Sequence, residues 1–528
     1  MSKTSPFADP LLTDLYEFTM AYAYFQSGRH QINAAFDLFF RKNPFGGEFT
    51  IFAGLAEAVE FLRHYRWTNE QIEFLCTQVP ECSEEFRGWL RDLDSSPVRL
   101  YAVPEGTVVF PGTPLLRVEG PLGLVQMMES ALLNLVAYPS LVATNAARMR
   151  LAAGDDKQLV EFGLRRAQGP DGAVSASRYS YLGGFDGTSN VKASQLFGIP
   201  SSGTQAHAYI QSYRDLDEIQ DPMLADPDGS EHDIRKLAVE FRERINGDHA
   251  NDGELASFIA YAQAFPSGFL ALVDTYDTLK SGVPNFLAVA LALKKIGYQP
   301  VGIRLDSGDL AHLSKVSRHM FSEAGKRVGI DLGEVKIVAS NEINEPTLRS
   351  LTQQGHEIDI FGVGTHLVTC QAQPSLGCVY KLVELGEIPR IKISQEPSKT
   401  TIPGRKVAYR LYGEKGYPLA DLMIRVGDEA PKAGERILCC HPWDETKRTY
   451  VVPACVDRLH HLVWDGSEAL EVTPLEAARE RAGQQIKGMR EDHLRLMNPT
   501  PYKVSLSQSL FEFTRELMLK QTPIGELR

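Results

Sequence analysis

Strand–helix units repeated between residues 270 and 365 constrain the fold more than any other feature of the chain. Buried strands are predicted at FLALVDTYD, VGIRLDSGD, VKIVASNE and IDIFGVGTHLVT, because each is a short apolar run that ends in polar residues or glycine. Helical spacing follows, as in the apolar residues from Leu310 to Val328. Since such units have right-handed crossovers, we expect parallel strands, either in an open doubly wound sheet or in a closed β/α barrel.

Polar residues and glycines follow the carboxyl ends of these predicted strands, the edge at which both architectures bind ligands. At or just beyond these ends are Asp274, Arg304, Asp306, Asn341, Gly362, Gly364 and Thr365. Arg304 and Asp306 are two residues apart on a strand and therefore point to the same face. A cation beside a carboxylate suits a ligand that carries an anionic group together with hydroxyls or a metal. The alternative is an internal ion pair, with Asp309 as a helix N-cap.

Three further motifs could bind phosphate or contribute chemistry. The two glycines and the threonine in FGVGTHLVT let backbone N–H groups approach a phosphate, although any tight turn can use such glycines. EFGLRRAQGPDG is predicted as a strand that ends in charge, and alternation along the strand favours Arg165 over Arg166 as the inward residue. In GTQAHAYI, His207 could handle phosphate, act as a base, or be a core residue.

LLTDLYEFTM near the start of the chain predicts a helix, with Thr13 as its N-cap and Tyr16 on its first turns. An aromatic residue at helical spacing beside Leu12, Leu15 and Phe18 is more typical of a core than of a ligand platform.

The flanking segments differ from the strand–helix region. Residues 98–122 alternate short β-branched runs with Pro and Gly, which predicts antiparallel strands, and residues 126–153 have helical spacing around Pro139. Residues 401–465 return to a β pattern, and the last part of the chain is mostly helical and charged.

Composition excludes several classes of function. A formal net charge of −12 and a pI of about 5.6 provide no positive field for a nucleic acid. The seven cysteines include no pair spaced C-x-x-C, so we expect reduced thiols and neither a disulfide framework nor a cysteine metal site. No apolar run approaches the ~20 residues that span a bilayer, and no leader pattern is present, so we expect a cytosolic protein without membrane contact.

In this order, LLTDLYEFTM, EFGLRRAQGPDG, LGGFDGTSNV, GTQAHAYI, LVDTYDT, RLDSGDL and FGVGT resemble the nicotinate phosphoribosyltransferase family. The resemblance implies an α/β fold: a decorated β/α barrel of the type II phosphoribosyltransferase kind, with a second β-rich α+β domain built from N- and C-terminal segments. The implied segments are 1–140 (α+β), 141–400 (catalytic barrel) and 401–528 (β-rich and helical, packing with the first). It also implies a homodimer with active sites near the interface.

The implied reaction joins nicotinate to 5-phosphoribosyl 1-pyrophosphate, giving nicotinate mononucleotide and pyrophosphate, with coupled ATP hydrolysis and with Mg²⁺ or Mn²⁺. His207 matches the motif histidine that accepts a phosphoryl group from ATP. Asp306 and Asp274 are then the carboxylates expected near the cation-like ribosyl centre. Many microbial relatives carry an acidic residue after the motif histidine, whereas this chain has Ala208, so ATP coupling needs its own test.

The resemblance also assigns the substrate contacts. Tyr16, supplied across the dimer interface, and Phe162 would stack on the pyridine ring, while Arg304 and Thr204 would bind the nicotinate carboxylate. The remaining contacts with phosphate, pyrophosphate or other substrate oxygens would be Arg165, Ser307, Gly362, Gly364, Thr365 and Lys381. The alternatives are a phosphoribosyltransferase for nicotinamide or quinolinate and an inactive protein that senses nicotinate or its nucleotide.

Overall fold

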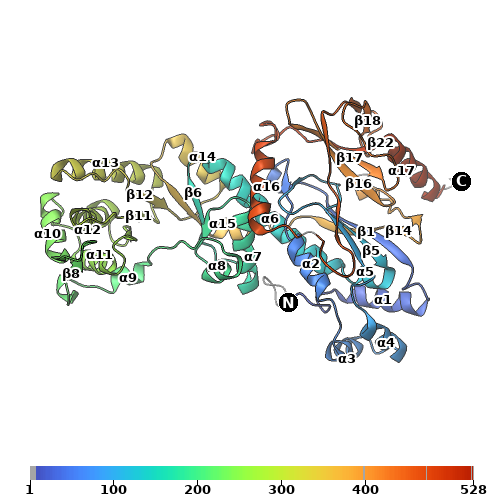
Figure 1. The fold of residues 1–528 in the computed structure, drawn as a ribbon, viewed down its shortest axis with the longest axis horizontal. Coiled ribbons are helices and arrows are strands. Elements are labelled where there is room, and N and C mark those ends of the chain that lie inside the picture. Colours follow the sequence, from blue (N-terminus) through green and yellow to red (C-terminus); the bar gives the residue numbers. More distant parts are fainter. Residues whose placement is uncertain (1–6, 397–398, 471, 525, 527–528) are drawn as a thin grey trace. The chain divides into compact units, whose positions relative to one another are not determined.

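The computed structural model describes residues 7–396, 399–470, 472–524 and 526. The chain forms two compact units. One contains residues 1–147, 168–184 and 370–528, and the other contains residues 148–167 and 185–369. The second unit carries the green to gold elements of Figure 1, from α8 to α14. The chain passes from one unit to the other after residues 147, 167, 184 and 369. The segment boundaries predicted at residues 140 and 400 stay a prediction.

A six-stranded sheet in which every neighbouring pair is parallel forms the centre of unit 148–167/185–369. Its strand order is β10-β11-β12-β13-β6-β7. The strands are β10 (Leu270–Leu272), β11 (Gly302–Leu305), β12 (Lys336–Ala339), β13 (Ile360–Val363), β6 (Gln158–Glu161) and β7 (Gly187–Thr188). The four strands predicted between residues 270 and 365 are therefore confirmed as neighbours in one parallel sheet.

Residues 200–205 run between the two edge strands of this sheet. Thr188 on β7 donates its N–H to the Pro200 carbonyl and accepts from the Ser202 N–H, both at 3.0 Å. At the other edge, the Leu272 N–H of β10 donates to the side-chain oxygen of Gln205 at 3.3 Å. This segment therefore links the two edges of the sheet and closes it into an irregular barrel. Of the two architectures that the strand pattern left open, the structure has the β/α barrel and not the open doubly wound sheet.

Helices between the strands cover this sheet. They include α8 (Val191–Phe197), α10 (Ile234–Arg244), α11 (Asp252–Ala264), α12 (Val283–Lys295), α13 (Leu310–Val328) and α14 (Glu345–Gln354). The predicted buried stripe of α13 is shifted: Leu313 and Val316 are only half buried, whereas Ser314, Ser317 and Phe321 are buried. Small hydroxyl side chains let the helix approach the sheet closely, so apolar spacing alone misplaced its inner face.

Two antiparallel or mixed six-stranded sheets make unit 1–147/168–184/370–528 β-rich. The first has the order β15-β14-β1-β5-β3-β21, and its strands are β15 (Ile388–Pro389), β14 (Cys378–Leu385), β1 (Asn33–Phe40), β5 (Leu116–Pro121), β3 (Arg99–Ala102) and β21 (His461–Trp464). The second has the order β19-β18-β22-β17-β16-β20, and its strands are β19 (Arg448–Val451), β18 (Ile437–Cys440), β22 (Val504–Ser507), β17 (Pro418–Arg425), β16 (Lys406–Tyr412) and β20 (Cys455–Arg458).

Buried polar contacts join the N- and C-terminal segments within this unit. The Lys406 ammonium pairs with Asp37, and both side chains are only 2 % exposed. Arg117 on β5 donates to the Lys406 carbonyl at 2.8 Å. The rings of Phe110 and Tyr502 stack with their centroids 3.6 Å apart. The second, β-rich domain built from both ends of the chain is thus confirmed.

Helix α6 (Glu129–Ala153) contains Pro139, as its sequence predicts. A proline has no N–H, so the Leu135 carbonyl four residues earlier loses its helical partner. Gly54, at φ 97°, packs its backbone against this carbonyl, and a Cβ at Gly54 would lie 2.0 Å from the oxygen. The side chain of Ser140, on the next turn, accepts from the Ala53 N–H at 3.0 Å. The proline therefore gives the N-terminal segment a place to dock.

Helix α1 (Leu15–Gln26) begins one residue later than its sequence predicts. Asp14, and not Thr13, takes the N-cap position, and the Thr13 hydroxyl donates instead to the Glu17 carboxylate at 2.8 Å. The remaining helices of this unit are α2 (Leu55–Arg63), α3 (Asn69–Gln78), α4 (Glu84–Asp92), α5 (Leu122–Gln126), α7 (Gly169–Leu182), α16 (Leu475–Lys487) and α17 (Gln508–Gln521).

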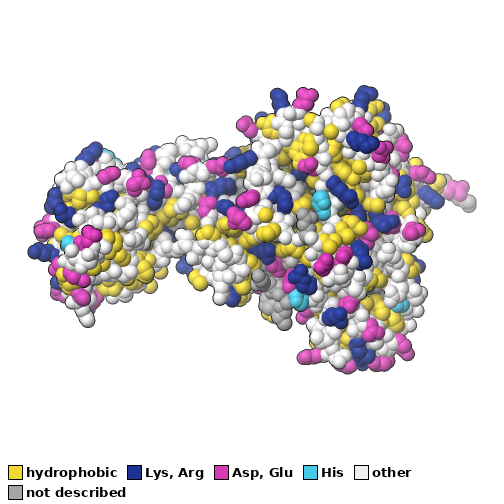
Figure 2. Space-filling model, in the orientation of Figure 1, with side chains coloured by type: hydrophobic (Ala, Val, Ile, Leu, Met, Phe, Trp, Pro, Cys, Tyr) yellow, Lys and Arg dark blue, Asp and Glu magenta, His cyan; other side chains and the backbone are white. Residues whose placement is uncertain are grey.

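Acidic and basic side chains are interspersed over the face drawn in Figure 2. Among the described helices, none combines the length and the apolar character that crossing a bilayer requires. The seven cysteines are free thiols, and five of them are buried.

Candidate active site

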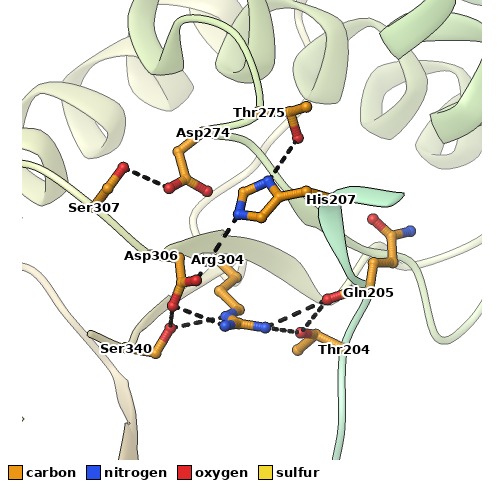
Figure 3. A network of polar contacts seen from close by, with 9 residues as sticks. All are labelled: Thr204, Gln205, His207, Asp274, Thr275, Arg304, Asp306, Ser307 and Ser340. Atoms are coloured by element: carbon orange, nitrogen blue, oxygen red, sulfur yellow. Dashed lines mark hydrogen bonds and ion pairs between the residues drawn. The ribbon is translucent and has the colours of Figure 1, made fainter. Parts of the chain in front are cut away.

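Arg304 is the centre of a polar network at the carboxyl edge of the parallel sheet (Figure 3). Its Nε donates to the Ser340 hydroxyl, one Nη donates to the Thr204 hydroxyl, and the other Nη donates to Asp306, each at 2.8 Å. A weaker contact of 3.4 Å joins it to the Gln205 carbonyl. Four of the five guanidinium donors are therefore engaged within the chain.

Asp306 links this network to the histidine of the GTQAHAYI motif. Its Oδ1 accepts from Arg304 and from the Ser340 hydroxyl, while its Oδ2 lies 3.9 Å from the His207 Nε2. The ion pair considered from sequence is present, and Asp309 also caps α13 by accepting from the His312 N–H at 3.0 Å. The pair is nevertheless part of a larger cluster, since Asp306 also lies beside His207. The Asp306 side chain is 28 % exposed, so a ligand can reach it.

His207 is the first residue of a short helix, α9 (His207–Gln211). Its Nδ1 lies 3.1 Å from the Thr275 hydroxyl, and its Nε2 faces Asp306 (Figure 3). The side chain is 41 % exposed, which rules out the core histidine considered from sequence. One ring nitrogen is held by a hydroxyl while the other faces an accessible carboxylate, so the imidazole is oriented and reachable.

Asp274 follows β10 at the same edge. One carboxylate oxygen accepts from the Ser307 hydroxyl at 2.6 Å. The other oxygen, Oδ1, is buried and accepts no hydrogen bond from the residues that the structure describes. A buried acceptor without a partner is costly, so this oxygen is a place where a ligand can be bound.

Glu254 on α11 is a fully buried carboxyl group near Asp274. It accepts from the Asn285 amide at 3.1 Å and from the Ser281 hydroxyl at 2.5 Å. Burial, with a smaller contribution from the neighbouring Asp274 charge, raises the pKa of Glu254 from 4.5 to about 7. Glu254 was not among the predicted site residues, because nothing in a helical segment marks a carboxyl group that points inward.

Phe162 provides an aromatic surface beside the network. The Arg304 guanidinium carbon lies 5.6 Å from the Phe162 ring centroid. Gly362 on β13 makes room for the ring, because a Cβ there would lie 2.3 Å from the Phe162 Cε2. Gly364 follows the strand and precedes α15 (Thr365–Val368), so the FGVGT motif combines a ring support with a turn.

Arg165 is not on a strand, contrary to the prediction for EFGLRRAQGPDG. β6 ends at Glu161, and Arg165 and Arg166 both lie in an exposed turn. The strand stops early because Glu161 folds back to accept from the Gly163 N–H and from the Thr188 hydroxyl. Strand alternation therefore does not select between the two arginines.

Tyr16 and Lys381 belong to the β-rich unit, so neither is part of the network in Figure 3. Both lie near Glu129, at the start of α6. Burial raises the pKa of Glu129, and the Lys381 charge opposes this shift. Burial and the Glu129 charge raise the pKa of Tyr16 to about 12, although its side chain stays 47 % exposed.

The network also contains polar residues that sequence analysis did not select. Thr275 follows Asp274 directly, Gln205 follows Thr204, and Ser340 precedes Asn341 at the end of β12. Asn341 was preferred as the polar strand end, but it takes a left-handed backbone conformation at φ 90° while Ser340 makes the contacts. Proximity to a selected residue was the only signal for all three.

Comparisons with known proteins agree on one family. Family models match residues 11–137 (nicotinate phosphoribosyltransferase N-terminal domain), 157–267 (nicotinate phosphoribosyltransferase family) and 405–514 (nicotinate phosphoribosyltransferase C-terminal domain). A nicotinate phosphoribosyltransferase from Dictyostelium discoideum is 54% identical over 99% of this chain and 90% of its own length. Nicotinate phosphoribosyltransferase 2 from Arabidopsis thaliana is 53% identical over 99% and 97%. The crystal structure of human nicotinic acid phosphoribosyltransferase, at 43% identity, superposes with a TM-score of 0.87 over 96% of this chain and 99% of that one.

Proposed function

The chain belongs to the nicotinate phosphoribosyltransferase family, and from this premise we propose that it joins nicotinate to 5-phosphoribosyl 1-pyrophosphate, giving nicotinate mononucleotide and pyrophosphate. The observation that carries the proposal is the convergence of His207, Arg304, Asp306 and Asp274 at the carboxyl edge of the parallel sheet. In β/α barrels substrates bind at this edge of the sheet, so the position of the cluster agrees with a role in catalysis.

Asp306 and Asp274 supply the negative charge that the reaction needs. As the bond between the ribosyl carbon and pyrophosphate breaks, positive charge develops on the sugar, and a fixed carboxylate stabilises it. Asp306 is held for this role from two sides, because Arg304 and Ser340 both donate to its Oδ1 and leave Oδ2 toward the site. The nicotinate nitrogen then forms the new bond to carbon as pyrophosphate departs.

Arg304 and Thr204 bind the nicotinate carboxylate in this proposal, and the pyridine ring lies against Phe162. The guanidinium already lies near that ring, and one of its N–H groups contacts none of the residues that the structure describes. A carboxylate would therefore accept from this N–H and would replace Thr204 or Gln205 as the acceptor of a second N–H of Arg304. Gly362 keeps the aromatic surface in place.

His207 is proposed to accept the γ-phosphoryl group of ATP. A ring nitrogen attacks phosphorus, the bond to the ADP oxygen breaks, and ADP leaves; water later attacks phosphorus and breaks the phosphorus–nitrogen bond. Thr275 at Nδ1 orients the ring for this exchange. Phosphorylation adds charge beside Asp306 and can order the segment that follows, so it acts on donor binding and not on the ribosyl transfer itself.

The residues at this edge fit a Mg²⁺ or Mn²⁺ ion bound together with the pyrophosphate. Within the described residues no group of three or more acidic, histidine or cysteine side chains forms a metal site by itself. Mg²⁺ usually takes only one or two carboxylates and completes its shell with phosphate oxygens and water. Asp274, whose Oδ1 accepts no hydrogen bond from the described residues, would be one such ligand, and Asp306 would be the second. When bound, the ion would neutralise charge on the departing pyrophosphate.

The remaining predicted contacts concern the rest of the substrate and the assembly. Ser307, Gly364 and Thr365 lie at the same sheet edge and are proposed as contacts for the phosphate and pyrophosphate, with Arg165 and Lys381. We propose a homodimer in which Tyr16 of one protomer stacks on the nicotinate bound by the other. Leu15, Tyr16 and Met20 expose apolar surface on α1, which supports a protein contact there. Free thiols throughout the chain support a reducing compartment such as the cytosol.

The test is pyrophosphate release from the purified protein. We expect release only when both nicotinate and 5-phosphoribosyl 1-pyrophosphate are present, and stimulation by ATP. Nicotinamide and quinolinate are run beside nicotinate; a preference for either would replace the assigned substrate. Nicotinate binding without release of pyrophosphate would instead identify a sensor.

His207→Ala tests the ATP step separately. We expect the variant to lose ATP hydrolysis and ATP stimulation while it keeps slow ATP-independent synthesis, because the ribosyl transfer uses other side chains. With γ-labelled ATP the wild type should give an acid-labile, base-stable phosphoprotein. His319→Ala removes an exposed histidine from α13 and serves as the control. Equal labelling of the His207 variant would assign the phosphoryl acceptor elsewhere.

A further inference from the structure

A cavity of about 690 Å³ lies in the β-rich unit. Its walls come from both six-stranded sheets of that unit: Phe39 on β1 and Val383 on β14 face it from one sheet, and Met423 on β17 and Thr449 on β19 face it from the other. None of its lining residues belongs to the network in Figure 3. Its volume falls within the ~300–1,000 Å³ typical of small-molecule sites.

The lining of this cavity is cationic in a protein whose net charge is −12. Five basic side chains line it against two acidic ones, Asp37 and Glu48, and the basic residues are Arg41, Lys406, Lys447, Arg448 and Lys503. Lys447, Arg448 and Lys503 are exposed, whereas Lys406 is buried. The exposed cations therefore lie where the cavity meets solvent, which is the arrangement that attracts a small anion.

The buried part of the lining contains polar atoms that lack partners. Asp37 is 1% exposed, and although its Oδ2 pairs with Lys406, its Oδ1 accepts no hydrogen bond within the described chain. The Arg41 Nε is likewise buried and donates to no described residue. A vacant acceptor together with a vacant donor calls for an occupant that offers both an N–H or O–H group and an acceptor atom.

Aromatic and imidazole groups complete the walls. Tyr502 is fixed by stacking on Phe110 and by donating its hydroxyl to Asp421 at 3.0 Å. The His441 Nδ1 accepts from the N–H groups of Trp443 and Asp444, at 3.2 and 3.0 Å, so its proton is on Nε2 and remains available as a donor. Burial lowers the pKa of His441, so the ring stays neutral. Trp443 itself is half-buried and lines the cavity.

We propose that this cavity is a second ligand site, separate from the candidate active site, for a nucleoside phosphate. Lys447, Arg448 and Lys503 bind the phosphate at the mouth. The planar base lies among the aromatic walls, and an amino or hydroxyl group of the base or ribose donates to Asp37 Oδ1 while a ring nitrogen or oxygen accepts from Arg41. An inorganic anion would satisfy the mouth and leave the inner atoms unpaired, and a neutral nucleoside would do the reverse.

The test uses AMP as the probe, with the full-length protein and titration calorimetry. AMP has no γ-phosphoryl group, so it cannot take part in the proposed phosphorylation of His207. We expect AMP to bind once per chain, more tightly than adenosine or inorganic phosphate, and to change the fluorescence of Trp443. The Trp443→Phe variant should bind AMP without that change in emission.

Matched variants locate the binding. Lys447→Ala combined with Arg448→Ala should weaken AMP binding by about tenfold or more, because charge-assisted hydrogen bonds to phosphate are lost. Lys326→Ala combined with Arg327→Ala removes two exposed cations from the end of α13 and should leave it unchanged. His207→Ala should also leave it unchanged. The proposal is overturned if AMP does not bind, if inorganic phosphate binds as tightly as AMP, or if the His207 variant loses AMP while the mouth variant retains it.

Discussion

Arg304 has a geometric task as well as a charge. Its planar guanidinium donates in three directions, to Ser340, Thr204 and Asp306. A lysine ammonium keeps the charge but cannot hold three partners in one plane or match a carboxylate with two parallel hydrogen bonds. We therefore expect Arg304→Lys to lower kcat/KM for nicotinate by about tenfold or more and to reduce its discrimination against nicotinamide. Steady-state kinetics with both pyridines measure this.

Arg318→Lys is the matched control for this change. Arg318 also bridges neighbouring strands, pairing with Asp359 at 2.8 Å and donating to the Val335 carbonyl, but it does so at the amino ends of β12 and β13. A loss of stability without a change in discrimination is expected there. Unchanged discrimination in the Arg304 variant would show that another group selects the carboxylate.

Asp274 tests the proposed ion binding. Asp274→Asn keeps an oxygen for the Ser307 hydroxyl but removes the charge and one carboxylate oxygen. We expect the Mg²⁺ concentration for half-maximal activity to rise by about tenfold or more, with little change in thermal stability. Asp228→Asn, an exposed carboxylate in the same unit, is the control. An unaltered Mg²⁺ dependence would assign the ion to other ligands.

Single residues at the carboxyl ends of strands could be predicted, because the alternation of side chains along a strand and the point at which the strand ends both depend on local sequence. Arg304 and Asp306 share a face for this reason. Arg165 could not be placed in the same way, since β6 ends at Glu161 through contacts with Thr188, a residue from another strand. Contacts made across the fold, such as Thr275 with His207, leave no periodic trace in either segment.

At the scale of elements, Glu254 joins three segments behind the sheet edge. It lies on α11 and accepts from Ser281 and from Asn285 on α12. Its pKa is about 7 in the folded protein and near 4.5 when solvated, so between pH 4.5 and 7 the folded state retains a proton that the unfolded chain has lost. Stability therefore falls as pH rises through this window, and the full penalty, about 3 kcal/mol, remains above it.

Glu254→Gln should remove this dependence. The glutamine carbonyl can accept the same two hydrogen bonds, and its amide mimics the protonated acid. We expect the variant to be more stable than the wild type at pH 8 and equal to it below pH 4.5, measured by urea unfolding in metal-free buffer. Glu243→Gln, at an exposed position on α10, should follow the wild type at every pH. A parallel pH profile for the Glu254 variant would contradict the buried-acid account.

Elements with strong periodicity were predictable, and their inner faces were less so. α12 and α13 begin near where Pro284 and Asp309 indicate, because proline and an N-cap are local signals. The buried face of α13 depends on how closely the helix approaches the sheet, and Ser314 and Ser317 permit that approach only once the sheet is formed. The same limit applies to Thr13, whose hydroxyl contacts Glu17 instead of the helix backbone.

At the scale of the whole molecule, the chain passes repeatedly between two units, each with its own sheets. That the two terminal segments share a domain was predicted from the family resemblance and not from their β pattern. No local signal pairs Lys406 with Asp37 across more than 350 residues. The cavity between the two sheets of that unit was equally invisible, since its lining comes from many short segments. Long-range pairing is the part of this fold that pattern analysis does not reach.

Tyr16 can show whether two protomers share their active sites. If Tyr16 of one protomer serves the active site of the other, Tyr16→Ala and Arg304→Ala damage different halves of each site. Neither homodimer then has an intact site. After subunit exchange, half of the dimers are mixed, and each mixed dimer has one site with Tyr16 and Arg304 both present, so about a quarter of the wild-type activity should return. If both residues serve the site of their own protomer, every site in the mixed dimer lacks one of them and no activity returns. Light scattering must first show a dimer; a monomer, or a mixture that stays inactive after verified exchange, would mean that Tyr16 does not act across an interface.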